Sequence, residues 1–109
     1  MPLQGTTVAP LHRSSCCATE HPGASGRARW RTLEIGNVRV RMVEYTAGYV
    51  ADHWCERGHV LLVLEGELVT ELRGAEPVVL RAGTSYQVAD GASAHRSTTR
   101  TGARLFIVD

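Results

Sequence analysis

One stretch decides how this chain is interpreted. It is Asp52-His53-Trp54-Cys55-Glu56-Arg57-Gly58-His59, followed by the apolar run Val60-Leu61-Leu62-Val63-Leu64 and then Glu65-Gly66-Glu67. His53 and Cys55 stand two residues apart, so on a strand their side chains point to the same face. Gly58 allows a turn, which returns His59 to that face at the start of the next strand. Imidazole and thiolate groups then converge, and this is the donor set of a transition-metal site.

The fourth candidate ligand is His95, which follows the turn-rich residues 88–94. From Trp30 onward the sequence contains three histidines and one cysteine, and all four fit one arrangement. The sequence therefore predicts a divalent transition metal bound by His53, Cys55, His59 and His95. Zinc is the first choice, and iron and nickel are alternatives. Four protein ligands would close the site, whereas three histidines without Cys55 would leave the open position that a catalytic metal needs.

Other interpretations of these residues stay open. The four side chains can be unrelated core and surface residues, or Cys55 can pair with His59 or His95 as a nucleophile. Asp52 is either a hydrogen-bond acceptor for a ligand imidazole or a solvated turn residue. Glu44 shares a strand face with Val38, Val40 and Met42. It is a general base if that face points inward, and a surface residue if it does not.

Length and composition bound the class of protein. The chain has 109 residues, 12 basic against 11 acidic side chains and a net charge of +1, with a hydrophobic fraction of 43%. This suits one domain, and the absence of a basic block gives no reason to expect nucleic-acid binding. The longest apolar run, residues 60–64, is too short to cross a membrane. No secretory signal is recognisable, so we expect a cytoplasmic location.

The cysteine count is odd, which argues against a disulfide framework. Cys16 and Cys17 are adjacent in a stretch rich in Gly, Pro, Ser and Thr. We interpret them as two thiols on an arm, with a redox pair or a second metal contact as the alternative.

The chain divides into two parts that differ in composition and in the periodicity of their apolar residues. Residues 1–29 lack apolar periodicity and predict an irregular N-terminal arm. Residues 30–109 predict a single domain of short strands separated by glycine turns, without helical periodicity, and therefore an antiparallel all-β barrel or sandwich. The expected strands span residues 30–35, 38–45, 49–56, 59–64, 67–73, 77–81, 84–89, 95–99 and 104–108.

Two motifs resemble those of the cupin superfamily. His53, Cys55, His59 and Gly66 have the spacing of the first motif, with Cys55 where a second histidine is usual and His59 where a glutamate is usual. Gly83, residues 89–91 and His95 resemble the second motif, with Thr99 where an asparagine is usual. More narrowly, Asp52-His53-Trp54-Cys55 and Leu105-Phe106-Ile107-Val108-Asp109 are similar to a small bacterial group, the DHCW-motif cupin-fold proteins.

The resemblance implies a small double-stranded β-helix barrel of the cupin or jelly-roll type, and a homodimer. It implies a metal in the barrel and a small-molecule ligand, but not one activity. One hypothesis is a non-catalytic metal-binding module. The alternative is a small metalloenzyme of the dioxygenase or isomerase type with an open three-histidine site. A third is a sugar-binding or signalling cupin without metal.

Overall fold

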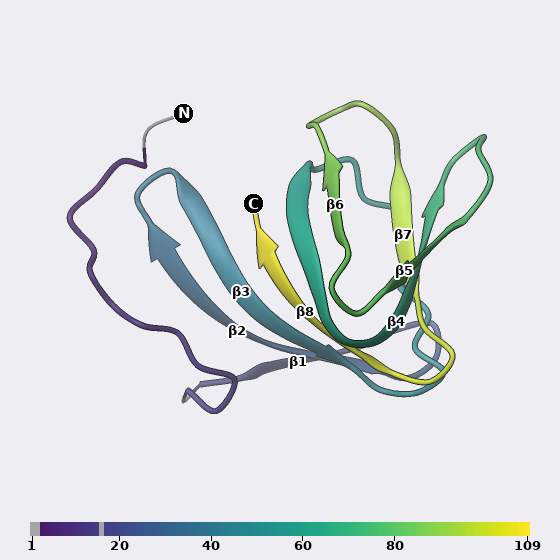
Figure 1. Ribbon diagram of the computed structural model, residues 1–109, viewed down its shortest axis with the longest axis horizontal. Coiled ribbons are helices and arrows are strands. Elements are labelled where there is room, and N and C mark those ends of the chain that lie inside the picture. Colours follow the sequence, from purple (N-terminus) through teal and green to yellow (C-terminus); the bar gives the residue numbers. More distant parts are fainter. Residues whose placement is uncertain (1–2, 16) are drawn as a thin grey trace.

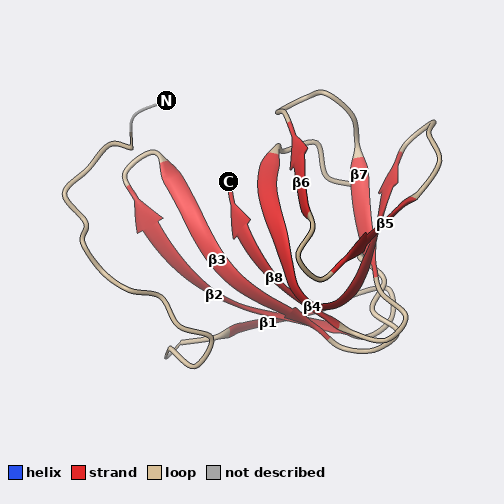
Figure 2. Ribbon diagram, in the orientation of Figure 1, coloured by secondary structure: helices blue, strands red, loops and turns tan. Residues whose placement is uncertain are grey.

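The computed structural model describes residues 3–15 and 17–109. Strands form all of its regular elements, and within these residues there is no helix, so none that could span a membrane (Figures 1 and 2). The all-β class predicted from the sequence is confirmed. The strands are β1 (Thr19–Pro22), β2 (Arg27–Ile35), β3 (Val38–Tyr45), β4 (His59–Leu72), β5 (Val78–Arg81), β6 (Ser85–Val88), β7 (His95–Thr98) and β8 (Ala103–Val108).

All strand pairs are antiparallel, and the main path through the sheet runs β1-β2-β3-β8-β4-β5. β6 pairs with the first half of β4, and β7 with the second half. In Figure 1 the strands curve from β1 and β2 on one side of the molecule to β5 and β7 on the other. This curvature creates an interior between the two sides, as in a small barrel.

β4 carries the chain from one half of the barrel to the other. Its register shifts between Val63 and Glu65, a β-bulge that bends the strand. Gly66 follows with a φ of 80°, and a Cβ there would lie 2.1 Å from the carbonyl oxygen of Gly102. The sequence predicted two strands separated by a turn at Gly66. That prediction was wrong because the bulge and the glycine bend β4 without ending it.

The core lies inside the barrel and is built from alternate residues of β3, β4, β5 and β8. Leu61 and Val63 of β4 are 1% and 0% exposed. His59 precedes Leu61 by two positions, so its side chain faces the interior as well. The buried cluster consists of Val43, Leu61, Val63, Leu68, Leu80, Ala103, Leu105 and Ile107.

The sheet begins earlier in the chain than the sequence predicted. β1 and the first three residues of β2 lie within residues 1–29, the stretch expected to be irregular. Thr19 pairs with Trp30 and His21 with Ala28. The sequence hides β1 because its residues are polar and mostly exposed, so no alternation marks it. The prediction for Cys16 concerns a residue outside the described part of the chain.

The predicted strand over residues 49–56 is also wrong. This segment makes only isolated bridges, from Val50 to Ser25 and Thr98 and from Cys55 to His95. Between them the chain bends at residues 52–53. The bend interrupts the ladder and brings residues 49–57 past the mouth of the barrel.

Candidate functional site

A cavity of about 260 Å³ opens at the mouth of the barrel. Its walls come from β1, β2, β3, β4, β7 and β8 and from the segment 49–57. All four residues predicted to bind a metal, His53, Cys55, His59 and His95, line this cavity. A metal ion or small molecule that enters the cavity can therefore reach the stretch 52–59. The histidines and the cysteine in its wall are His21, His53, Cys55, His59 and His95.

His59 and His95 are brought together by the barrel. They stand at the first positions of β4 and β7, and their ring centroids are 4.7 Å apart with an interplanar angle of 77°. The Nε2 atoms of both rings are buried and have no hydrogen-bond partner among the described residues. A buried nitrogen without a partner costs free energy, on the order of 1–3 kcal/mol. The pair therefore marks a place where a further group fits.

The hydrogen bond of His95 fixes where its lone pair lies. Its Nδ1 is 3.2 Å from the carbonyl oxygen of Ser93. A carbonyl oxygen only accepts, so in the neutral ring Nδ1 carries the proton and Nε2 is the bare nitrogen. Metal-bound histidines commonly donate their second nitrogen to a carbonyl in this way. His95 thus has the tautomer that a metal ligand needs.

His59 is neutral at physiological pH. Burial and then the nearby His95 together lower the pKa of His59 to about 4, against a smaller opposing effect of Asp109. A neutral imidazole is the form that binds metals.

Two backbone hydrogen bonds join Cys55 to His95. The amide of Cys55 donates to the carbonyl oxygen of His95 at 2.8 Å, and the amide of His95 donates to the carbonyl oxygen of Cys55 at 2.8 Å. Residues paired in this way place their side chains on the same face of a sheet. The thiol of Cys55 therefore belongs on the cavity side, next to the imidazole of His95.

His53 lies at the rim rather than inside. Its side chain is 70% exposed, and its Nδ1 is 2.7 Å from Oδ1 of Asp52. The other carboxylate oxygen of Asp52 is 2.9 Å from Nε2 of His21. The hydrogen bonds from His53 and then from His21 hold the pKa of Asp52 below its usual value. The predicted contact between Asp52 and a candidate ligand imidazole is therefore present.

The described residues include no group of three or more His, Cys, Asp or Glu side chains close enough together to hold a metal ion. The structure brings His59 and His95 together and places Cys55 beside them, while His53 turns towards Asp52. Sequence reasoning gave His21 no role, and no local signal could have found it. It reaches the rim only through the pairing of β1 with β2.

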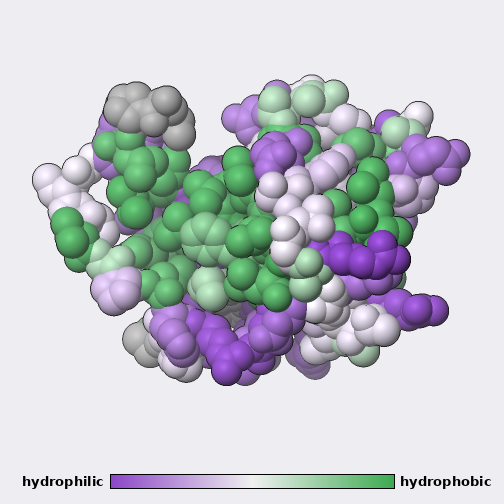
Figure 3. Space-filling view, in the orientation of Figure 1, coloured by the Kyte–Doolittle hydropathy of each residue, from purple (hydrophilic) through white to green (hydrophobic). Residues whose placement is uncertain are grey.

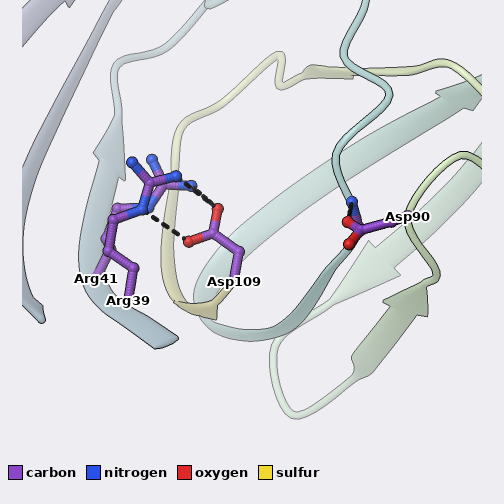
Figure 4. A network of polar contacts seen from close by, with 5 residues as sticks. Arg39, Arg41, Asp90 and Asp109 are labelled. Carbon is purple, nitrogen blue, oxygen red and sulfur yellow. Dashed lines mark hydrogen bonds and ion pairs between the residues drawn. The ribbon is translucent and has the colours of Figure 1, made fainter. Parts of the chain in front are cut away.

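Charged residues form another part of the cavity wall. Nε and Nη2 of Arg39 each donate to a carboxylate oxygen of Asp109 at 3.0 Å, and Nη2 of Arg41 donates at 2.8 Å (Figure 4). Burial raises the pKa of Asp109, but the hydrogen bond from Arg39 and the charges of Arg41 and Arg39 outweigh it, and the pKa lies below its usual value. Asp90, also drawn in Figure 4, lies away from this group and accepts from the amide of Gly58.

Glu44 is not part of the cavity. It lies beside Arg104 of β8, with a closest oxygen–nitrogen distance of 3.8 Å. Arg39 and Arg41 face inward instead, so the hypothesis that Glu44 is an internal general base is wrong. The alternation in β3 showed that its two faces differ, but the apolar face is the outer one.

Comparisons with known proteins identify the fold of this chain. No protein-family model matches the chain, and no curated protein matches its sequence. Solved structures do match. A cupin-like protein from Thermotoga maritima superposes with a TM-score of 0.66 at 20% identity over 77% of this chain and 68% of that chain. An RmlC-like cupin from Shewanella frigidimarina gives 0.61 at 25% identity over 74% and 73%. The chain has the cupin fold.

The fold is also that of a solved enzyme. Ectoine synthase from P. lautus superposes with a TM-score of 0.63 at 22% identity, over 74% of this chain and 62% of that chain. The predicted cupin resemblance is thus confirmed. The narrower similarity to the DHCW-motif group stays a prediction.

Proposed function

We propose that this cupin binds a divalent transition metal, zinc first, with iron or nickel as alternatives, at the mouth of its barrel. The ligands are His59, His95 and Cys55, with His53 as the fourth. The observation that carries the proposal is the pair of buried, unpartnered Nε2 atoms of His59 and His95. A thiolate and imidazoles together suit zinc, iron or nickel and do not suit magnesium or calcium.

The fit of the four residues is unequal. His59 is neutral, His95 has its Nε2 lone pair free, and both rings line the cavity. Cys55 is joined to His95 by two backbone hydrogen bonds. The contact of His53 Nδ1 with Asp52 leaves its Nε2 free, and His53 joins if its exposed ring turns into the cavity. Its participation decides between a closed four-ligand site, which would stabilise the barrel, and a site with an open position.

The alternative function is a small metalloenzyme acting on a small molecule. The cavity beside the two histidines has room for one, and ectoine synthase shares the fold. A metal with an open position supplies a Lewis acid for such a reaction. The fold alone does not choose a reaction, so this alternative rests on the cavity.

The proposed location is the cytoplasm. A thiol ligand is kept reduced there, and a reduced Cys55 is required for metal binding.

Metal content is the test. The untagged protein is purified without chelators, reconstituted with zinc or cobalt, desalted and analysed by elemental analysis and absorption. We expect one metal per chain, a thiolate-to-cobalt charge-transfer band, and loss of the metal in His59→Ala and His95→Ala. Cys55→Ser should lose the band. His12→Ala and Cys17→Ser, both on the arm, are the matched controls and should keep metal and band. A wild-type protein that takes up no metal would contradict the proposal.

We further propose a homodimer formed through the outer face of the sheet. The alternate residues of β3, β8 and β4 that point away from the core are mostly apolar, and Figure 3 shows hydrophobic side chains gathered over these three strands. In β2 the same face contains Arg29 and Arg31 as well as Leu33. Cross-strand pairing joins them in two rows, of which one contains Leu33, Val40, Val108 and Val60 and the other Met42, Phe106 and Leu62. Val60 is 48% exposed and the other members of the two rows are half-buried. A contiguous apolar surface of this kind is typical of an interface.

A charged row beside the apolar rows favours a second copy as the occupant. Arg29, Glu44, Arg104 and Glu65 are cross-strand neighbours in that order, so their charges alternate. A two-fold axis parallel to the strands reverses the row, and Arg29 then faces Glu65 of the second copy. Opposite charges meet at each position, as an isologous interface requires.

Sedimentation at micromolar concentration tests the dimer. We expect twice the chain mass for the wild type and a monomer for Phe106→Glu, because a charge is buried in the interface. Val79→Glu, at an exposed apolar position of β5, is the control and should remain dimeric. A monomeric wild type would overturn the dimer and leave the metal proposal untouched.

A further inference from the structure

The charged side chains in the cavity wall are unbalanced. Four are arginines, Arg39, Arg41, Arg57 and Arg96, and one is an aspartate, Asp109. The charge of Arg96 has a carboxylate partner outside the wall, since its Nη2 donates to Glu71 at 2.8 Å, although its Nε is buried without a hydrogen-bond partner among the described residues. Among the residues that line the cavity, the remaining three arginines have one carboxylate, Asp109, and Glu34 outside the cavity also acts on Arg39. The wall of the cavity therefore carries excess positive charge.

Arg41 has binding capacity that the protein does not use. Its side chain is 19% exposed, and Nη2 donates to Asp109. Its Nε is buried and has no hydrogen-bond partner among the described residues. A guanidinium presents Nε and the terminal nitrogens as a planar fork that matches a carboxylate. Asp109 occupies this kind of fork on Arg39, and Arg41 still offers Nε.

The arginines and the two histidines belong to one site. Arg41 and Asp109 act in opposite directions on the pKa of His59, which places both within electrostatic reach of that ring. Arg57 lies at the exposed rim, and its charge helps to keep the pKa of Asp109 low. An anion held by the arginines would therefore lie beside the candidate metal position.

The rest of the wall is aromatic and aliphatic. Tyr45 and Tyr49 stack with ring centroids 4.2 Å apart, and Trp30, Leu61 and Ile107 also line the cavity. Ligand sites combine apolar walls with a few placed polar groups in this way. A volume of about 260 Å³ limits the occupant to a small molecule.

We infer that the cavity binds a small organic acid, with its carboxylate on Arg41 and the neighbouring arginines and its apolar part against the aromatic wall. The inference deepens the proposed function, and it rests on that function for the idea that this cavity is a ligand site. The arginine group itself needs no metal. Binding of the acid can therefore be measured with and without zinc.

Benzoate and benzamide are the probes, because they have nearly the same shape and differ in charge. Calorimetric titrations use the full chain, both stripped of metal and loaded with zinc. We expect benzoate to bind at least about tenfold more tightly than benzamide, since a charge-assisted hydrogen bond is lost with the amide. Arg41→Gln should weaken benzoate at least about tenfold and leave benzamide unchanged. Arg81→Gln, on the outside of β5, is the matched control and should behave as wild type.

A second variant keeps the test valid if Arg41→Gln does not fold, since Asp109 would then lose a partner. Arg57→Gln changes an exposed residue and should weaken benzoate severalfold, with the difference shrinking at high salt. The inference is overturned if benzoate and benzamide bind alike, if the arginine variants bind benzoate as wild type does, or if benzoate binds only in the presence of zinc. Binding of benzoate by a wild type that takes up no zinc would support the inference and contradict the metal proposal.

Discussion

Leu61 and His59 lie two residues apart on the same face of β4, yet they belong to regions of opposite character. Leu61 is packed in an apolar cluster and is 1% exposed. His59 lies at the mouth, where the Nε2 atoms of two histidines and the Nε of Arg41 are buried and have no partner in the described part of the chain. The packed region stabilises the fold. The mouth destabilises it, because each buried nitrogen without a hydrogen-bond partner costs on the order of 1–3 kcal/mol. Unsatisfied polar groups collected at one end of a barrel indicate function rather than folding.

Truncating the packed region should have the largest effect. Leu61→Ala removes a buried side chain and leaves a cavity, so we expect the free energy of unfolding to fall by about 2–5 kcal/mol in urea titrations. Leu64→Ala on the same strand is the control. Leu64 is 40% exposed, so its truncation should cost less than about 1 kcal/mol. Equal losses would mean that the interior of β4 is not packed as described.

The bend of β4 connects the two regions, and its glycine should be the next most sensitive position. Gly66→Ala introduces strain at a φ of 80° and a clash with the carbonyl oxygen of Gly102, and should cost about 2–3 kcal/mol. Gly74→Ala has a similar φ of 83° but meets no atom within 4 Å, so it should cost about 1 kcal/mol. The difference between the two unfolding free energies measures the close approach alone. No difference would mean that Gly102 can move away.

The same contrast explains what the sequence predicted and what it did not. Apolar runs and glycine turns sufficed for an all-β barrel, and β3 was predicted with its observed bounds. Which face of β3 points inward could not be predicted. Alternation shows that the side chains of Arg41 and Met42 point in opposite directions, but it does not show which of them enters the barrel. The expectation that an apolar face points inward holds in the core and fails at the mouth. His59 and His95 were recognisable as reactive residue types. His21 depends on the pairing of β1 with β2, and the arginine group on the pairing of β3 with β8, which is distant in sequence.

Converting the mouth into core should stabilise the metal-free protein. His59→Leu replaces a ring with an unpartnered buried nitrogen by an apolar side chain of similar size. We expect the metal-free protein to gain about 1 kcal/mol of unfolding free energy and to lose zinc binding. Thermal and urea unfolding of chelator-treated samples measure the gain. Matched zinc-loaded samples should reverse the order, since only wild type would then be stabilised by metal. A loss of stability in the metal-free variant would show that the His59 nitrogen does have a partner.

Lowering the pH should have the smallest effect on the free energy of unfolding, and this effect comes from the same buried ring of His59. The pKa of His59 is lowered to about 4 in the folded protein by burial and by His95, whereas a histidine in the unfolded chain has a pKa of 6.5. Below that value the unfolded chain binds a proton that the folded chain does not, so stability falls as pH drops from 6.5 towards 4. Partial exposure of His59 screens the effect, and we expect metal-free protein to lose less than about 1 kcal/mol between pH 7.5 and pH 5.5. His59→Leu removes the ring and should remove this part of the pH dependence. If the variant kept the full dependence, another group would be responsible and the ring at the mouth would be better solvated than the core beside it.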